Sequence, residues 1–120
     1  MGITILLVDD DQKLRRYLRR LLDREQDLRV VGEAGDGAMA FELTQAMPPD
    51  IILMDLHMPR LNGLDATRMI KAEQPEIKII ILTQYQEDPY RRAALECGAD
   101  AFLPKQTRLP DLLATIREVI

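Results

Sequence analysis

Two runs of mostly apolar residues end directly on carboxylates. Ile51–Met54 is followed by Asp55, and Ile3–Val8 is followed by the acidic residues 9–11. Short apolar runs that are bounded by turn residues predict strands with both faces buried. A charged carboxylate at the exit of such a strand is costly unless it has partners. We therefore expect cations or hydrogen-bond donors close to these acids.

Three further segments predict strands. They are Leu28–Val31, Ile77–Leu82, which ends before Thr83, and Ala101–Leu103, which leads through Pro104 to Lys105. We expect the strand at Leu28–Val31 to stop at Gly32, because the glycines of residues 32–37 are typical of a loop.

The segments between these strands carry apolar residues at helical spacing. We expect the first helix to begin after Asp11 and the third after Asn62, since both side chains can cap a helix. The spacing predicts helices around Leu14–Leu22, Met39–Met47, Leu64–Lys71, Asp88–Cys97 and Leu109–Ile120. Pro89 and Pro110 suit the first turns of the last two helices, and Gly98 suits the position just after the fourth.

The alternation of strand and helix predicts an α/β fold with a doubly wound, five-stranded parallel sheet and five helices on its two faces. No repeat, linker or low-complexity segment interrupts the pattern. We expect a single domain over residues 1–120, with no effector domain in this chain. Sheets of this kind bind ligands beyond the carboxyl ends of their strands.

Composition and charge exclude several classes of protein. The formal net charge of −4 argues against direct binding of nucleic acid by this domain. A single cysteine, Cys97, excludes an internal disulfide, and we expect it to be a small buried residue. No apolar run approaches the ~18 residues of a membrane span, and the first residues lack the features of a secretory signal. We expect a cytoplasmic protein without membrane contact.

The first predicted helix is rich in basic residues, namely Lys13, Arg15, Arg16, Arg19 and Arg20. Most of them fall outside the apolar stripe of the helix. We interpret them as a solvated face, with the docking of a kinase as the alternative.

Polar residues stand just past four of the predicted strands, and all are expected at one edge of the sheet. They are Asp9, Asp10, Asp55, Thr83 and Lys105. A set of oxygen ligands favours a hard cation such as Mg²⁺, and neighbouring carboxylates need a cation to stay ionised. Lys105 and Thr83 are suited to phosphate. Aspartate can attack phosphorus to form an aspartyl phosphate, and we favour Asp55 because it stands alone on the central strand.

This ordered set resembles the receiver domain of two-component response regulators over essentially the whole chain. The matching stretches are LLVDDD, PDIILMDLHMPRLNG, IIILT and GADAFLPK. The resemblance implies a flavodoxin-like (CheY-like) sheet with the strand order 2-1-3-4-5. The stretch VVGEAGDG and the pair Gln106-Thr107 resemble the LuxR/NarL-type subfamily, whose effector domains bind DNA.

The resemblance also implies a role for each site residue. Asp55 would be the phosphoacceptor, and Mg²⁺ would be held by Asp9, Asp10, Asp55 and the backbone carbonyl of His57. Thr83 and Lys105 would contact the phosphoryl group, and Phe102 matches an aromatic switch position. The phosphodonor would be a phosphohistidine on a sensor histidine kinase or a phosphotransfer protein. The fourth helix, fifth strand and fifth helix would bind an effector partner or a second copy in a homodimer.

The chain departs from the family pattern at a few positions. Gln84 stands after Thr83 where the family has a small residue, and Gln106 rather than proline follows Lys105. We expect the Lys105–Gln106 bond to be trans, because a cis bond before a non-proline residue costs about 3 kcal/mol. Phe102 lacks the hydroxyl of the tyrosine that is common at its position. His57 and Tyr85 are expected to line the site.

Three other functions are weighed against a phosphorylated signalling module. A phosphorylation-independent scaffold would lack the switch, and the intact polar set argues against it. A Mg²⁺-dependent phosphatase of the haloacid dehalogenase type would carry a second aspartate two residues after Asp55, where His57 stands. A flavodoxin-type cofactor binder would carry a Ser/Thr/Gly-rich loop after the first strand, and this chain has acids there.

Overall fold

The computed structural model describes residues 2–120, in which five strands alternate with five helices. In chain order the elements are β1 (Ile3–Val8), α1 (Gln12–Leu22), β2 (Leu28–Ala34), α2 (Gly37–Ala46), β3 (Ile51–Met54), α3 (Gly63–Glu73), β4 (Lys78–Thr83), α4 (Asp88–Glu96), β5 (Ala101–Pro104) and α5 (Leu109–Val119). The strands form one parallel sheet in the order β2-β1-β3-β4-β5. The predicted fold class and strand order are confirmed.

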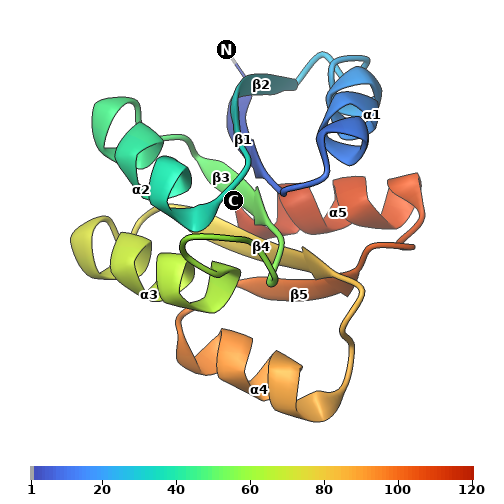
Figure 1. Cartoon of the computed structure of the whole chain (residues 1–120). Coiled ribbons are helices and arrows are strands. Elements are labelled where there is room, and N and C mark those ends of the chain that lie inside the picture. The colour runs from blue at the N-terminus through green and yellow to red at the C-terminus, as the bar shows by residue number, and fades with distance from the viewer. Residues whose placement is uncertain (1) are drawn as a thin grey trace.

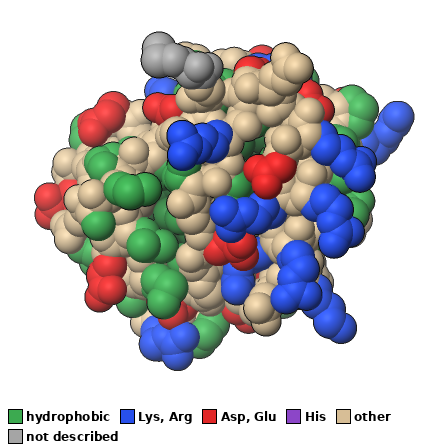
Figure 2. All heavy atoms as spheres, turned by 90° about the horizontal axis from the view of Figure 1, so that it is seen from above, with side chains coloured by type: hydrophobic (Ala, Val, Ile, Leu, Met, Phe, Trp, Pro, Cys, Tyr) green, Lys and Arg blue, Asp and Glu red, His purple; other side chains and the backbone are tan. Residues whose placement is uncertain are grey.

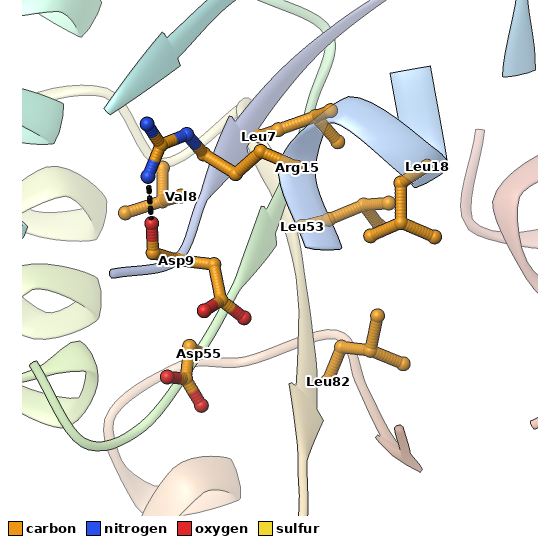
Figure 3. A pocket seen from close by; sticks show the side chains of 8 residues that line it. All are labelled: Leu7, Val8, Asp9, Arg15, Leu18, Leu53, Asp55 and Leu82. Atoms are coloured by element: carbon orange, nitrogen blue, oxygen red, sulfur yellow. Dashed lines mark hydrogen bonds between the residues drawn. The ribbon is translucent and has the colours of Figure 1, made fainter. Parts of the chain in front are cut away.

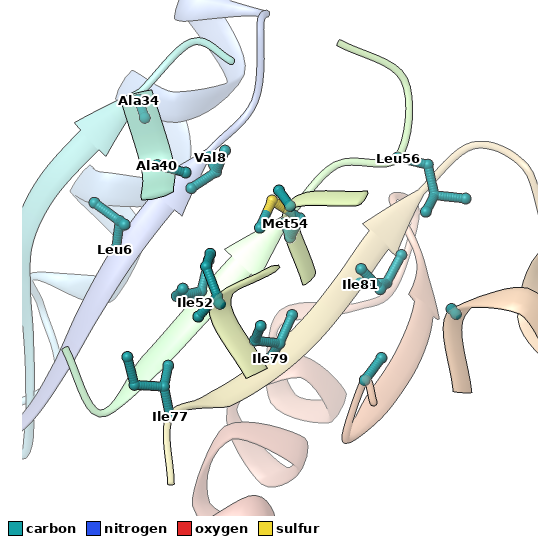
Figure 4. Close-up of a cluster of buried hydrophobic side chains, with 14 of the residues drawn as sticks. Leu6, Val8, Ala34, Ala40, Ile52, Met54, Leu56, Ile77, Ile79 and Ile81 are labelled. Atoms are coloured by element: carbon teal, nitrogen blue, oxygen red, sulfur yellow. The ribbon is translucent and has the colours of Figure 1, made fainter. Parts of the chain in front are cut away.

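Helices cover both faces of the sheet (Figure 1). Successive residues of a strand point to opposite faces, so a continuous apolar run supplies two cores at once. Ile52, Met54, Ile79 and Ile81 pack with α2, α3 and α4, as Figure 4 shows for this cluster. Ile51, Leu53, Ile80 and Leu82 pack with α1 and α5 on the other face. Both faces of β1, β3 and β4 are therefore buried, and the site stands at the ends of these strands.

Side-chain caps fix the starts of three helices, with Asp11 at α1, Asp36 at α2 and Asn62 at α3. Asp11 accepts hydrogen bonds from the amides of Lys13 and Leu14, at 3.0 and 3.2 Å, and Asn62 accepts from the amide of Asp65 at 2.9 Å. Each cap satisfies backbone donors that have no partner within the helix. The two predicted caps are therefore confirmed. Gly98, which has a φ of +102°, follows the end of α4 as expected.

The second strand is longer than predicted, and the expected stop at Gly32 is wrong. Gly32, Glu33 and Ala34 pair with Leu6, Leu7 and Val8. The register shifts between Ile5 and Leu6, so that Val31 is an extra residue on β2. Gly32 therefore marks a β-bulge rather than the start of a loop.

Some apolar residues of the predicted helices lie in solvent. Tyr17, Met39 and Met47 are exposed, and Met47 follows the last residue of α2. Cys97 is buried at the end of α4, as expected, and its sulfur accepts a hydrogen bond from Arg68 Nη2 at 3.3 Å. Within residues 2–120, no helix has both the length and the apolar character needed to cross a membrane.

A buried carboxylate ties the loop before α2 to the loop before α3. Asp36 is 4% exposed, and its Oδ1 accepts from the amide of Met39 at 2.8 Å. Its Oδ2 accepts from Arg60 Nε at 2.8 Å and lies 2.7 Å from Arg60 Nη2. The Met39 amide and the Arg60 guanidinium hold the pKa of Asp36 below its usual value. Arg60 has a φ of +67°, which non-glycine residues adopt rarely.

Replacing Asp36 by alanine is expected to lower the free energy of unfolding by about 2 kcal/mol, because the cap and the partner of Arg60 are lost together. Asn62→Ala removes a cap alone and should cost about 1 kcal/mol. The native state holds the Asp36 proton more weakly than the unfolded chain. The free energy of unfolding that Asp36→Ala loses is therefore largest above pH 3.8, and this loss shrinks as the pH falls below that value. Urea unfolding of both variants measures these losses, and equal losses at neutral pH would contradict the prediction.

Candidate functional site

Three carboxylates meet at the carboxyl edge of the sheet. One oxygen from each of Asp9, Asp10 and Asp55 lies within 4.8 Å of the others. Asp9 and Asp55 are buried, at 6% exposure each, while Asp10 is exposed. The parallel pairing of β1 with β3 brings them together, and the Asp55 amide donates to the carbonyl of Val8 at 2.9 Å. The structure thus gathers the acids that the sequence placed after the first and third strands.

A lysine that follows the edge strand β5 reaches this acidic cluster. Lys105 Nζ lies 2.9 Å from Asp9 Oδ2 and 3.4 Å from Asp55 Oδ1. The backbone amide of Lys105 donates to the carbonyl of Thr83 at 2.9 Å, which fixes the start of its loop. Burial works to lower the pKa of Lys105, but Asp9 and Asp55 outweigh it and raise that pKa above its usual value. Lys105 therefore stays an ammonium ion and offsets part of the negative charge.

Asp55 is the acid whose ionisation is most disturbed. Burial and the neighbouring charge of Asp9 raise the pKa of Asp55 to about 6, although Lys105 opposes the shift. Its Oδ1 accepts from the amide of Leu56 at 2.9 Å and faces Lys105. Within residues 2–120, no side chain or amide donates to its Oδ2. One oxygen of this carboxylate is held by donors, and the other has none among the same residues.

Thr83 ends β4 beside these charged groups and is fully buried. Its Oγ1 accepts a hydrogen bond from the amide of Tyr85 at 3.0 Å. Because the oxygen acts as an acceptor there, the hydroxyl proton remains available to a ligand. Thr83 thus keeps a hydroxyl donor at the end of β4, but it is not among the residues that line the cavity at the site.

An open cavity of about 340 Å³ leads to the site. It is lined by Asp10, Asp11, Asp55, His57, Gln84, Tyr85 and Lys105. The expectation that His57 and Tyr85 line the site is confirmed. Gln84 is exposed and is one of the lining residues, and the cavity keeps its volume with that side chain in place.

Three aromatic rings join the two loops that flank the cavity. The rings of His57 and Tyr85 are 4.1 Å apart between centroids. Tyr90, in the first turns of α4, lies 5.7 Å from His57 and 5.4 Å from Tyr85. Tyr90 carries no signal in the sequence beyond its place in an amphipathic helix.

Phe102 lies inward on β5 and is 4% exposed. The guanidinium of Arg91 sits over its ring, 5.1 Å from the centroid, and connects it to α4. The loop after β5 contains no cis bond, in agreement with the expectation for Lys105–Gln106. Thr107 Oγ1 donates to the carbonyl of Pro104 at 2.6 Å and closes that loop.

The basic residues of α1 do not all form a solvated face. Lys13, Arg16 and Arg20 are exposed, as predicted, and Figure 2 shows lysine and arginine side chains gathered on one side of the molecule. Arg15 and Arg19 instead form ion pairs with Glu33 of β2 at 3.0 and 2.6 Å. The helical spacing does not reveal this contact, because the sequence places Glu33 in a glycine-rich stretch that is typical of a loop.

The residues of the cluster fit a magnesium ion. All donors are oxygens, and Mg²⁺ is bound in proteins through one or two carboxylates with water and phosphate oxygens. Two of the three carboxylates are buried, so that a divalent cation would relieve a repulsion that water screens poorly. No nitrogen or sulfur ligand that zinc would favour belongs to the cluster.

Comparisons with known proteins agree on one family. The model of the response regulator receiver domain matches residues 5–117. Response regulator GacA of Pseudomonas aeruginosa is 36% identical over 117 residues, which cover 98% of this chain and 55% of that protein. Response regulator protein VraR of Staphylococcus saprophyticus is 38% identical over 118 residues, which cover 98% of this chain and 56% of that protein. The chain spans about half the length of the curated relatives that it matches.

Solved structures give the same result. The response regulator domain of Thermotoga maritima CheB matches with a TM-score of 0.92 and 34% identity, over 99% of this chain and 96% of that one. A LuxR-family response regulator from Aurantimonas sp. matches with a TM-score of 0.94 and 34% identity, over 99% of this chain and 85% of that one. The family model and the relatives cover nearly the whole chain, which therefore belongs to the response regulator receiver domain family.

Proposed function

We propose that this chain is a phosphorylation-controlled receiver in which Asp55 accepts a phosphoryl group from a phosphohistidine. The observation that carries the proposal is the asymmetry of the Asp55 carboxylate. Oδ1 is held by the Leu56 amide and Lys105, whereas Oδ2 has no donor within residues 2–120. A carboxylate that is held through one oxygen near a cation, with its other oxygen unbonded, is suited to nucleophilic attack on phosphorus.

The transfer breaks the bond between phosphorus and the donor's imidazole nitrogen and forms a bond to Asp55 Oδ2. The freed imidazole takes a proton from solvent. Lys105, already 3.4 Å from Asp55, would pair with an oxygen of the incoming phosphoryl group. Thr83 would donate its hydroxyl proton to another oxygen. Attack of water on phosphorus later returns the carboxylate and releases inorganic phosphate.

Receiver domains generally bind Mg²⁺ at an aspartate cluster, and this chain has one. Asp9, Asp10, Asp55 and the backbone carbonyl of His57 would hold the ion. Once bound, it would neutralise the carboxylates and the charge of the transferring phosphoryl group. Asp9 keeps its contact to the Asp11 amide at 2.8 Å, which fixes one of its oxygens.

The output of the switch is proposed to lie on the face made by α4, β5 and α5. Thr83 would move toward the phosphoryl group, and Phe102, which is already buried with the Arg91 guanidinium over its ring, would shift with it. The face would then bind an effector domain or a second copy of the chain. Relatives of this chain include DegU of Brevibacillus brevis, named a transcriptional regulatory protein, so we propose transcription as the output.

Receiver domains are mostly not ordinary enzymes. In our proposal residues 1–120 act as one receiver unit in the cytoplasm and catalyse only their own phosphorylation and slow dephosphorylation. The donor is a sensor histidine kinase or a phosphotransfer protein. His57 occupies the position where a phosphatase of the haloacid dehalogenase type has its general acid, so turnover of phosphate esters is not expected.

Incubation with acetyl phosphate and Mg²⁺ is expected to add one phosphoryl group, about 80 Da, to the intact protein as a hydroxylamine-labile acyl phosphate. Asp55→Asn should abolish the adduct, and chelation of Mg²⁺ should prevent it. Asp23→Asn, a change of an exposed acid at the end of α1, is the matched control and should be phosphorylated normally. Intact-mass spectrometry measures each outcome.

An adduct that persists in Asp55→Asn would contradict the assignment of the phosphoacceptor. Absence of both the adduct and Mg²⁺ binding in the wild-type protein would overturn the proposed function. The phosphorylation-independent scaffold would then be the better description.

A further inference from the structure

An arginine of α1 contacts the backbone of the acidic cluster rather than its carboxylates. Arg15 Nη1 donates a hydrogen bond to the backbone carbonyl of Asp9. Figure 3 shows this bond and the carboxylates of Asp9 and Asp55 beyond it. Arg15 Nε donates to Glu33 Oε1 at 3.0 Å. The guanidinium therefore joins β2 to the loop that carries the acids.

This contact is sheltered and held from its other side. The side chain of Arg15 is 16% exposed and that of Glu33 is 26% exposed, so solvent screens the pair incompletely. The second oxygen of Glu33 accepts from Arg19 Nη1 at 2.6 Å. Fixed at both oxygens, Glu33 orients the guanidinium of Arg15 toward Asp9.

Asp9 is anchored at each of its polar groups. Its amide donates to the carbonyl of Ala34 at 3.0 Å. Its Oδ1 accepts from the Asp11 amide at 2.8 Å, and its Oδ2 lies 2.9 Å from Lys105 Nζ. Arg15 is the side chain that bonds the Asp9 peptide carbonyl, the group that leads into Asp10. It therefore fixes the direction in which the chain presents the Asp10 carboxylate.

We propose that Arg15, oriented by Glu33, is a positioning residue that holds Asp9 and Asp10 ready to bind the divalent cation. The inference rests on the proposed function, since it concerns the same site. Three carboxylate oxygens within 4.8 Å of one another repel when no cation separates them, and that repulsion would spread the loop. A bond to the peptide carbonyl resists the spreading. A preformed site then loses less free energy in ordering its ligands when the cation binds.

The direction in which the Mg²⁺ affinity changes on removal of Arg15 distinguishes a positioning role from a purely electrostatic one. Arg15 is a cation, so by charge alone its removal would strengthen the binding of another cation. Loss of positioning would weaken that binding. Arg15→Met is therefore expected to raise the Mg²⁺ dissociation constant roughly 10-fold, as loss of an outer partner of metal ligands does.

Mg²⁺ titrations followed by calorimetry and amide NMR test the inference. Arg15→Lys keeps the charge but cannot bond both Glu33 and the Asp9 carbonyl with a planar fork, so it should also weaken binding. Glu33→Gln should weaken it less, by about 3-fold, because an amide oxygen can still accept one bond. Arg16→Met removes a charge from the exposed face of α1 and serves as the matched control with unchanged affinity. In metal-free protein, Arg15→Met should also lose hydrogen-exchange protection at the amides of Asp9 and Asp11, which donate to the Ala34 carbonyl and to Asp9 Oδ1.

An unchanged or tighter Mg²⁺ dissociation constant in Arg15→Met, with the wild-type protein binding normally, would overturn the inference and leave the proposed function standing. Failure of the wild-type protein to bind Mg²⁺ would overturn both. Should Arg15→Met not fold, Arg15→Lys and Glu33→Gln decide the question, and normal affinity in both would overturn the inference.

Discussion

Replacing Gly63 by alanine is expected to destabilise the protein by roughly 3 kcal/mol or more, and to distort the site at the same time. A Cβ at position 63 would lie 2.0 Å from the backbone oxygen of Asp55 and 3.0 Å from the Cα of Leu56. Both are backbone atoms, so no side chain can rotate to make room. The Gly63 amide also donates to the Leu56 carbonyl at 2.7 Å, which draws α3 against the end of β3.

Gly35→Ala is the matched control for this steric effect. A Cβ at Gly35 would meet only Arg15 Nη1 at 3.6 Å, an ordinary contact. The control should be neutral or stabilising by up to about 1 kcal/mol, through the lower entropy of the unfolded chain. In Gly63→Ala alone, the stability measured by chemical denaturation and the rate of phosphorylation by acetyl phosphate should both fall. Wild-type stability in that variant would show that the start of α3 can move away from Asp55 at little cost.

The sequence predicted that the acids of the site and Lys105 would meet, because parallel topology places distant residues at one edge of the sheet. Asp9, Asp55 and Lys105 each follow a strand whose apolar run is easily recognised. Parallel, adjacent strands bring their carboxyl ends to the same edge of the sheet, regardless of how much chain separates the strands in the sequence. The meeting of Lys105 with Asp9 and Asp55 follows from that geometry.

Contacts that depend on loops and bulges could not be predicted in this way. The bulge at Val31 carries Glu33 past the expected end of β2 and toward Arg15, and a glycine in a strand resembles a glycine in a loop. The pair of Asp36 with Arg60 joins two loops whose sequences show no periodicity. Such contacts are set by the tertiary fold, so local pattern carries no signal for them.

The ionised carboxylate of Asp55, which follows β3, destabilises the native state when no cation is bound. Burial and the charge of Asp9 raise its pKa to about 6 in the native state, above the 3.8 of an ordinary aspartate. The native state therefore binds the proton more tightly than the unfolded chain does. Its stability falls as the pH rises from about 4 to about 6 and is constant above that range, as far as Asp55 is concerned.

Asp55→Asn is accordingly expected to stabilise the metal-free protein at neutral pH by about 2 kcal/mol, or roughly 5–10 °C in the midpoint of thermal unfolding. The gain should vanish near pH 4, where the native carboxyl group is already neutral. Glu42→Gln, which removes an exposed charge from α2, is the control and should change little. Thermal unfolding in the presence of a chelator, at several pH values, measures the difference.

Added Mg²⁺ should raise the midpoint of the wild-type protein more than that of Asp55→Asn, since binding to the native state alone is stabilising. A gain that persisted unchanged at pH 4 would mean that the asparagine acts through packing, and no gain at neutral pH would mean that Lys105 already offsets the buried charge.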